Sequence, residues 1–208
     1  MKIKKFLKSP FLWAFLIGIA SLHLVKEMAL RRRSAPDPIL MVPDWRLTDH
    51  HGQPFGQADL KGKVVIANFF FSSCPSICPK LTEAMKEVYQ RVQDNSSSIE
   101  FISITVDPET DTPEVLTNYM NKYGINHPNW RCLTGTKKDI YDVVVNKMKV
   151  HMGEKEAVPG SPTSYDIPHL AHLALFDQQG ALRGLFKTET IEMAALVRAA
   201  KFLVEKGL

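Results

Sequence analysis

Two cysteines separated by three residues are the side chains with the clearest capacity for chemistry. Cys74 and Cys78 stand in the stretch FSSCPSICP, residues 71–79, which follows an apolar run and precedes a helical pattern. We therefore expect a helix from near Cys74 to about Gln93, with both cysteines in its first turns. Residues four apart share one helical face, and backbone N–H groups at a helix start stabilise thiolates. The spacing predicts a reactive pair, suited to redox chemistry or to metal binding.

Copper is the metal that this donor set favours. Two soft thiolates suit Cu(I), and a nearby imidazole would complete a three-coordinate site that also holds Cu(II). Structural zinc sites normally use four Cys or His ligands, and the chain has only one further cysteine, Cys132. Cys132 stands in an apolar context between Trp130 and Leu133, which is typical of a small buried residue. The residues alone leave open which histidine joins the pair.

The first 33 residues have the layout of a membrane anchor. A lysine-rich start is followed by the mainly apolar stretch Phe11–Val25 and then by the basic triplet Arg31–Arg33. No small-residue cleavage signal follows the apolar stretch, so we expect an uncleaved signal-anchor over residues 1–33. A proline-containing linker at residues 34–39 then leads to one domain over residues 40–208. The signal-like order predicts a domain on the extracytoplasmic side.

Charge argues against a nucleic-acid partner. The formal net charge is +4, but residues 1–33 hold eight Lys or Arg and one acid. The remainder has 18 basic against 21 acidic residues, a net charge of −3. A mildly acidic domain lacks the basic footprint that a phosphate backbone requires. We therefore expect no nucleic-acid binding.

Apolar periodicity predicts alternating strands and helices after an opening hairpin near residues 45–55. The expected strands are residues 64–71, 99–106, 170–176 and 181–186, and the expected helices begin near residues 74, 113, 137 and 190. The first of these strands is continuously apolar, as a strand buried on both faces would be. Alternation of this kind favours an α/β domain with a mostly parallel sheet.

Several motifs together resemble the Sco/SenC family of copper proteins. They are LKGK at 60–63, CPSICP at 74–79, VDPE at 106–109, DTPE at 111–114 and LTG at 133–135, and the likeness extends over most of residues 43–208. The resemblance implies a thioredoxin-like fold, with a mixed central sheet flanked by helices. It also implies that copper binds to this chain through Cys74 and Cys78.

The resemblance also singles out one histidine. The ligand histidine of the family stands eight residues before an aspartate in a turn, and here Asp177 points back to His169. The family usually has aspartate directly before that histidine, whereas Pro168 stands there in this chain, with Asp166 two positions further back. His172 is a nearby alternative. Positions three apart on a strand face opposite sides, so the two histidines cannot both face the cysteines unless a bulge intervenes. Following the resemblance, we expect His169 and not His172 to complete the site.

The function implied by the resemblance is delivery of copper to the dinuclear copper site of cytochrome c oxidase subunit II. This would be a binding function without turnover, at the outer face of a bacterial cytoplasmic membrane, and it would require a copper donor. The alternative is an enzyme that reduces the cysteines of that site, in which Cys74 attacks a disulfide, Cys78 resolves it and a thiol reductant restores the pair. A peroxide-reducing enzyme ranks last, because the paired prolines and the histidine argue against it.

Overall fold

Two compact units make up the protein, whose computed structural model describes residues 10–32, 35–158 and 165–208. The first unit contains helix α2 (Pro10–Arg32), which carries exposed apolar side chains such as Phe11 and Leu22. In the described ranges, no helix reaches the length and hydropathy needed to cross a membrane. Residues 33 and 34, where the predicted anchor meets the predicted linker, lie outside those ranges. The second unit, residues 35–208, contains all the residues expected to do chemistry.

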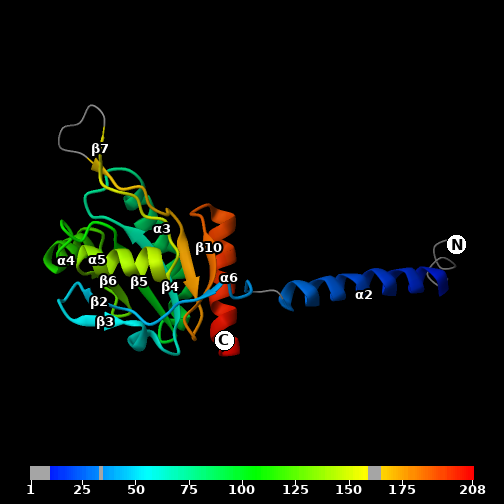
Figure 1. The fold of residues 1–208 in the computed structure, drawn as a ribbon. Helices are drawn as coiled ribbons and strands as arrows, with labels where there is room; N and C mark the ends of the chain where they lie inside the picture. The colour runs from blue at the N-terminus through cyan, green and yellow to red at the C-terminus, as the bar shows by residue number, and fades with distance from the viewer. Residues whose placement is uncertain (1–9, 33–34, 159–164) are drawn as a thin grey trace. The chain divides into compact units, whose positions relative to one another are not determined.

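An eight-stranded sheet forms the centre of the second unit (Figure 1). The strand order is β1-β10-β9-β4-β5-β6-β2-β3. The bounds are β1 (Leu40–Met41), β2 (Arg46–Asp49), β3 (Pro54–Gly56), β4 (Val64–Phe70), β5 (Ile99–Thr105), β6 (Trp130–Thr134), β9 (Leu173–Phe176) and β10 (Ala181–Phe186). Every residue of β4 is buried, which confirms the predicted central strand.

Strand directions are mixed. Within the described residues, β4 pairs with β5 and β5 with β6 in parallel, and all other strand pairs of this sheet are antiparallel. The expectation of a mostly parallel sheet was therefore wrong, whereas the mixed sheet implied by the resemblance is confirmed. The reason lies in short connections, because a tight turn at residues 177–180 joins β9 to β10 and forces an antiparallel hairpin. Gly180 has a positive φ of 85° in that turn.

Helices flank the sheet. They are α3 (Ile77–Val92), α4 (Pro113–Lys122), α5 (Lys137–Tyr141), which continues as a π-helical stretch η3 (Asp142–Lys147), and α6 (Thr190–Lys206). The face of α3 that carries Leu81, Met85 and Val88 is fully buried. α3 packs against α6 and is linked to α4 by a 2.7 Å hydrogen bond between Thr82 Oγ1 and Tyr119 Oη. These helices hold the start of α3, and with it Cys78, in a fixed place.

Several short strands were not predicted from the sequence. Strands β1 and β6 were not expected, nor was the short hairpin of β7 (Glu156–Ala157) and β8 (Tyr165–Asp166). Residues 159–164, which come between β7 and β8 in the sequence, lie outside the described residues. Single turns of 3-10 helix, η1 (Gln57–Leu60) and η2 (Gln93–Asn95), complete the described secondary structure.

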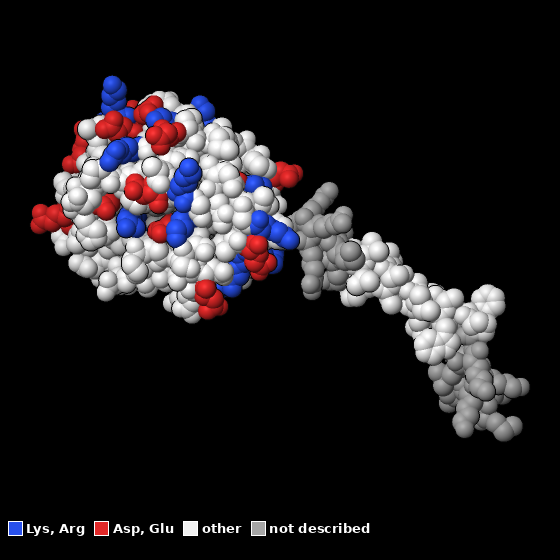
Figure 2. All heavy atoms as spheres, turned by 90° about the horizontal axis from the view of Figure 1, so that it is seen from below, with Lys and Arg blue, Asp and Glu red and all other residues white. Residues whose placement is uncertain are grey.

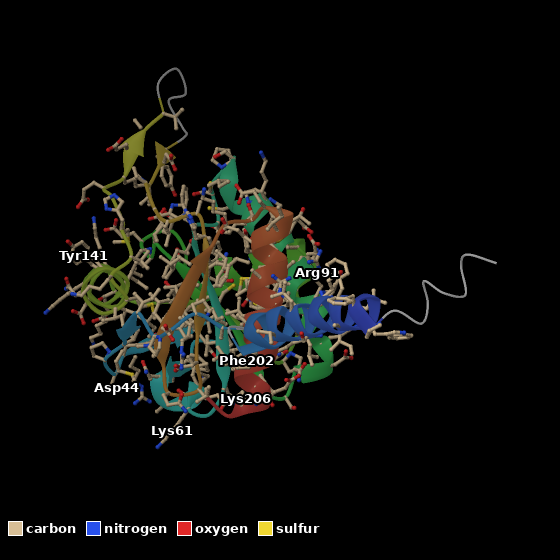
Figure 3. All side chains as sticks on the ribbon, turned by 90° about the vertical axis from the view of Figure 1, so that its right-hand side faces the viewer. Asp44, Lys61, Arg91, Tyr141, Phe202 and Lys206 are labelled. Atoms are coloured by element: carbon tan, nitrogen blue, oxygen red, sulfur yellow. The ribbon has the colours of Figure 1, made fainter. Side chains whose placement is uncertain are left out.

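The surface carries both signs of charge. Figure 2 shows Lys and Arg interspersed with Asp and Glu over one face of the second unit. The side that bears α6 displays Phe202 and Lys206, with the Lys206 ammonium 5.9 Å from the centre of the Phe202 ring, and Arg91 lies near the end of α3 (Figure 3). The face in Figure 2 therefore presents no field of a single sign that would steer a charged partner.

Candidate metal centre

The two cysteines follow the buried end of β4, but only one of them lies in a helix. α3 begins at Ile77, so Cys78 is in its first turn, while Cys74 lies in the preceding loop. The Cys74 N–H donates to the Phe71 carbonyl at 3.2 Å, which closes a turn. The expectation that both cysteines open one helix and share a face was therefore wrong. Pro75 gives a physical reason, because a residue before proline is disfavoured in the helical conformation.

Both thiols are buried, with residue exposures of 5% for Cys74 and 0% for Cys78, and they are free in this structure. Burial alone raises the pKa of Cys74, but N–H groups of residues 76–78 and the Cys78 thiol donate toward its sulfur, and the net pKa is lowered. Burial raises the pKa of Cys78 far above the ordinary cysteine value, and the neighbouring charges of Cys74 and Asp166 add to this effect. The prediction that the helix start activates both thiols is therefore wrong for Cys78. The two thiols therefore differ, with a lowered pKa at Cys74 and a raised pKa at Cys78.

His169 reaches the cysteines from a distant part of the chain. Its Nε2 atom lies 3.7 Å from Cys78 Sγ, and its Nδ1 atom lies 2.6 Å from the carbonyl oxygen of Ile167. A carbonyl oxygen only accepts hydrogen bonds, so this contact places the ring proton on Nδ1 and leaves the lone pair of Nε2 toward the sulfur. The Phe71 ring makes an edge contact with the imidazole at 5.8 Å between centroids. The ring is thus oriented as a metal ligand would be.

The cysteine loop is anchored by Asp111, a residue with no exposed surface. Its carboxylate accepts the Ser72 N–H at 3.0 Å, the Ser72 hydroxyl and the Thr105 hydroxyl. Asp111 belongs to the DTPE motif, so the sequence held a signal for it, although its role was not predicted. Because Ser72 lies two positions before Cys74, these contacts fix the path of the chain into the site.

A second set of contacts, also not predicted, holds the segment that carries His169. Tyr165 and Lys155 both reach the buried carboxylate of Asp107. Asp107 belongs to the VDPE motif, but nothing in the sequence pattern pointed to Tyr165 or Lys155.

His172 is placed differently from His169. Neither histidine lies in a regular strand, because β9 begins at Leu173 and His169 forms only an isolated bridge with Met152. The argument from alternating strand faces therefore does not apply. Nevertheless, the contact with Cys78 is made by His169, whereas the Nδ1 atom of His172 is buried without a hydrogen-bond partner.

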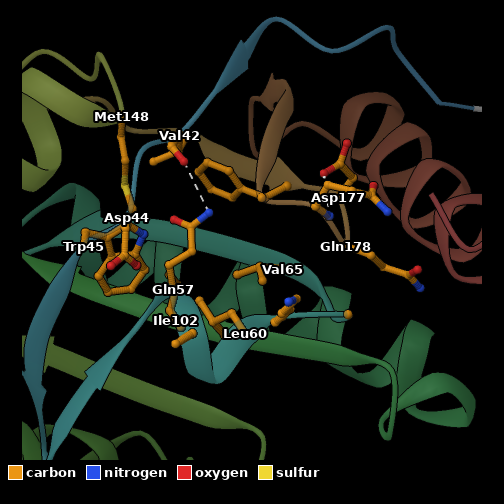
Figure 4. Close-up of a pocket in the computed structure, with 16 residues that line it drawn as sticks. Val42, Asp44, Trp45, Gln57, Leu60, Val65, Ile102, Met148, Asp177 and Gln178 are labelled. Carbon is orange, nitrogen blue, oxygen red and sulfur yellow. Dashed lines mark hydrogen bonds between the residues drawn. The ribbon is translucent and has the colours of Figure 1, made fainter.

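The site lies away from the cavity drawn in Figure 4. That cavity of about 520 Å³ is lined mainly by apolar side chains, among them Trp45, Val65 and Phe176. Val65 is near the start of β4, whereas the cysteines follow its end. None of Cys74, Cys78 and His169 lines the cavity. The cavity is therefore separate from these three residues.

Among the three donor side chains, Cys78 lies between the other two. Cys78 lies within hydrogen-bonding reach of Cys74 on one side and 3.7 Å from His169 on the other. In the part of the chain that the structure describes, no three His, Cys, Asp or Glu side chains make a ready-formed metal-binding group. The donors are soft sulfur and imidazole nitrogen, a set that suits copper. The arrangement can also transfer electrons between dithiol and disulfide.

Comparison with known proteins agrees with the motifs. The SCO1/SenC family model matches residues 33–205. The chain belongs to the SCO1/SenC family. An SCO2-like protein of Rickettsia felis is 31% identical over 176 residues, which cover 80% of this chain and 82% of that protein. The predicted family is thus confirmed.

Two solved SCO1/SenC structures share the fold. Bradyrhizobium japonicum ScoI with copper bound has a TM-score of 0.66 and 27% identity, and covers 81% of this chain and 99% of its own. BsSco, a member of the Sco family of cytochrome c oxidase assembly proteins in which a disulfide switch was identified, has a TM-score of 0.68 and 23% identity, with coverage of 83% and 99%.

This SCO1/SenC chain departs from the family pattern next to its histidine. Where the resemblance implies an aspartate directly before His169, Pro168 stands here. Asp166 does not replace that aspartate in the described contacts, because its Oδ1 accepts the Ile167 N–H at 2.9 Å. The Ile167 carbonyl instead holds the Nδ1 atom of the imidazole. A backbone carbonyl is one of the usual partners of ligand histidines, so the departure leaves the orientation of the ring supported.

Proposed function

We propose that this protein binds a copper ion through Cys74, Cys78 and His169 and delivers it to the dinuclear copper site of cytochrome c oxidase subunit II. The observation that carries the proposal is the approach of His169 Nε2 to Cys78 Sγ at 3.7 Å, with Nδ1 held by a carbonyl. Plain thiol–disulfide exchange needs no such imidazole. Membership of the SCO1/SenC family and the likeness to a ScoI that binds copper support the same reading.

Delivery requires that the acceptor replace the ligands of this chain in turn. The cysteine loop is suited to such exchange, because Cys74 lies outside the helix and retains 5% exposure, while Cys78 and His169 are held by packing and by a backbone hydrogen bond. Cysteine thiolates of the acceptor would take the ion, since Cu(I) favours soft sulfur ligands.

A membrane location would help this transfer. We propose that residues 1–33 anchor the chain in the bacterial cytoplasmic membrane, with the domain on its outer face. The support is the basic-apolar-basic order of the sequence. An anchor holds the copper protein and a membrane-bound acceptor on one surface and so raises their effective concentration.

A second candidate function is reduction of the cysteines of that copper site, and the difference between the two thiols favours it. The lowered pKa of Cys74 suits attack on a partner disulfide, which forms a mixed disulfide and releases one partner thiolate. Cys78 then attacks Cys74 Sγ, releases the second thiolate and leaves a Cys74–Cys78 disulfide. The partner gains two electrons, and an external thiol reductant must restore the pair.

An anaerobic copper titration of the reduced full-length chain in mild detergent tests the main proposal. Cu(I) and Cu(II) are added separately and followed by absorption spectroscopy in the wild type, Cys78→Ala and His169→Ala. Cys132→Ala is the matched control, because Cys132 is also a buried free cysteine but has no role in the proposal.

We expect one copper ion per wild-type chain, with a thiolate-to-copper charge-transfer band for Cu(II). Cys78→Ala should lose both ions, His169→Ala should lose Cu(II), and Cys132→Ala should keep both. Absence of copper binding, with intact reduction of a disulfide substrate, would replace the main proposal by the second one. Transfer itself is checked by mixing the loaded protein with the reduced copper domain of subunit II and measuring where copper elutes.

A further inference from the structure

The segment that ends in His169 is held by a network separate from the proposed ligands. We call residues 165–169 the histidine arm. The arm begins in β8, and its central residue Ile167 is buried with 3% exposure. One attachment is made by backbone alone, since the Gly153 N–H donates to the Pro168 carbonyl at 2.6 Å. The other attachment runs through Tyr165.

Asp107 is the fixed end of the second attachment. It lies two residues beyond Thr105, the last residue of β5, and is 3% exposed. Its Oδ2 atom accepts hydrogen bonds from the Tyr165 hydroxyl and from Lys155 Nζ, the latter at 3.1 Å. Burial raises the pKa of Asp107, but hydrogen bonds from Tyr165, Thr110 and Lys155 outweigh it and lower the pKa overall. The carboxylate is thus ionised and paired.

Lys155 and Tyr165 come from the two sides of the β7–β8 hairpin. The Lys155 ammonium lies 3.6 Å from the centre of the Tyr165 ring, within the range of a cation–π contact. The ammonium therefore interacts with the ring and with the carboxylate at the same time. The buried carboxylate of Asp107 thus binds side chains from both sides of the hairpin that leads to His169.

Tyr165 also contacts the cysteine loop. Its hydroxyl lies 2.5 Å from Ser73 Oγ, one residue before Cys74, and its ring stacks on Phe71 at 5.6 Å between centroids. The Tyr165 proton is given to Asp107, so the Ser73 hydroxyl is the donor in the contact with Tyr165. The hydrogen bonds run in one direction, from the cysteine loop through Tyr165 to Asp107.

We propose that Asp107 and Tyr165 are positioning residues that hold the histidine arm against the cysteine loop, so that their loss weakens Cu(II) binding much more than Cu(I) binding. The inference rests on the proposed function for its copper readout. Two thiolates suffice for Cu(I), whereas Cu(II) depends on the imidazole. Tyr165 is four residues before His169, so releasing its hydroxyl loosens the histidine arm. The cysteine loop also loses its contact at Ser73, but the hydrogen bonds from Ser72 to Asp111 still hold it.

The test compares Tyr165→Phe and Asp107→Asn with wild type in the full-length chain. Tyr123→Phe is the matched control, because Tyr123 caps the C-terminal end of α4 and its ring contacts Tyr119 and Lys122, which are not part of this network. Cu(I) and Cu(II) affinities are measured by competition with chelators. Amide hydrogen exchange of the metal-free proteins is followed by mass spectrometry over residues 150–172 and, as an internal reference, over α3.

We expect Cu(II) affinity to fall about 10- to 100-fold in both variants, as for other residues that support metal ligands, and Cu(I) affinity to change less than about 3-fold. Exchange should accelerate in residues 150–172 and not in α3, and Tyr123→Phe should match wild type. Equal losses of both ions, or unchanged exchange in residues 150–172, would overturn the inference. A wild type that binds no copper, combined with faster exchange in the variants, would remove the proposed function and the copper readout but keep the arm attachment.

Discussion

The Nε2 atom of His169 lies 3.7 Å from the Sγ atom of Cys78, although 91 positions separate these residues in the chain. Each partner is fixed independently, Cys78 by the buried start of α3 and His169 by the Ile167 carbonyl. Cys74 is the less constrained donor, because it lies in the loop before the helix. The two thiols therefore differ in their place relative to α3 and in the direction of their pKa shifts, and the first prediction depends on that difference.

Cys74 should react first with an alkylating agent. N–H donors outweigh the effect of burial and lower the pKa of Cys74, whereas burial raises the pKa of Cys78 and of Cys132. In metal-free reduced protein, iodoacetamide should modify Cys74 at pH values below those at which ordinary cysteines react, because the thiolate is the nucleophile. Peptide mapping by mass spectrometry over a pH series checks the order. Modification of Cys78 before Cys74 would contradict it.

The long, buried elements of the fold could be predicted from the sequence, whereas the short or interrupted ones could not. Continuous apolar residues revealed β4, which is buried along its whole length, and regular spacing revealed the start of α6, a long helix with one buried face. β6 was missed because Arg131 interrupts its apolar run. The pairs of residues that form β7 and β8 are too short to show any period.

The site was only partly predictable. The cysteine spacing marked the pair, but the thiol pKa values depend on burial and on which N–H groups face each sulfur, and a sequence pattern contains neither. His169 was found through resemblance and not through spacing, since no local rule connects residues 91 positions apart. Tyr165 and Lys155 had no signal, because their roles arise only when the hairpin folds onto Asp107.

Asp111→Ala should destabilise the cysteine loop. The substitution leaves the buried Thr105 hydroxyl and the Ser72 groups without their acceptor, and we expect a loss of about 2–3 kcal/mol in the free energy of unfolding. Urea unfolding followed by tryptophan fluorescence measures it. Glu109→Ala is the control, because this exposed carboxylate pairs with exposed Lys137 at 3.8 Å and should cost less than about 0.5 kcal/mol.

The effect of Asp111→Ala should also depend on pH. Burial raises the pKa of Asp111, although hydrogen bonds from Ser72 and Thr105 oppose this. A group whose folded pKa lies above its unfolded value contributes stability that is fully present below the unfolded pKa and declines as pH rises through the folded pKa. The difference in the free energy of unfolding between wild type and Asp111→Ala should therefore become smaller as the pH rises from acidic to neutral. A difference that widens over that range would contradict the assignment.

His172→Ala should retain Cu(II) binding. The Nδ1 atom of His172 is buried without a partner, and the contact with Cys78 belongs to His169. Removing His172 takes away no proposed ligand, so the Cu(II) charge-transfer band should persist in His172→Ala and vanish in His169→Ala. Parallel titrations of the two variants provide each other's control. The reverse pattern would transfer the ligand role to His172.

Arg183→Met should weaken the hairpin that follows the histidine arm. Arg183 Nε lies 2.6 Å from Asp177 Oδ2, and the two side chains are 12% and 2% exposed. Asp177 also accepts the N–H groups of Gln179 and Ala181, so its carboxylate organises the β9–β10 turn. Loss of the guanidinium leaves a buried carboxylate without its cation. Breaking a buried ion pair in this way should lower the free energy of unfolding by about 3–5 kcal/mol.

Urea unfolding of the metal-free chain measures the effect of Arg183→Met, with Arg91→Met as the matched control. Arg91 pairs with Glu87 on the surface of α3, where both side chains are more than one third exposed, so its replacement should change the free energy by less than about 0.5 kcal/mol. If Arg183→Met is as stable as Arg91→Met, the ion pair does not support the turn, and the position of Asp177 must then be maintained by its backbone hydrogen bonds alone.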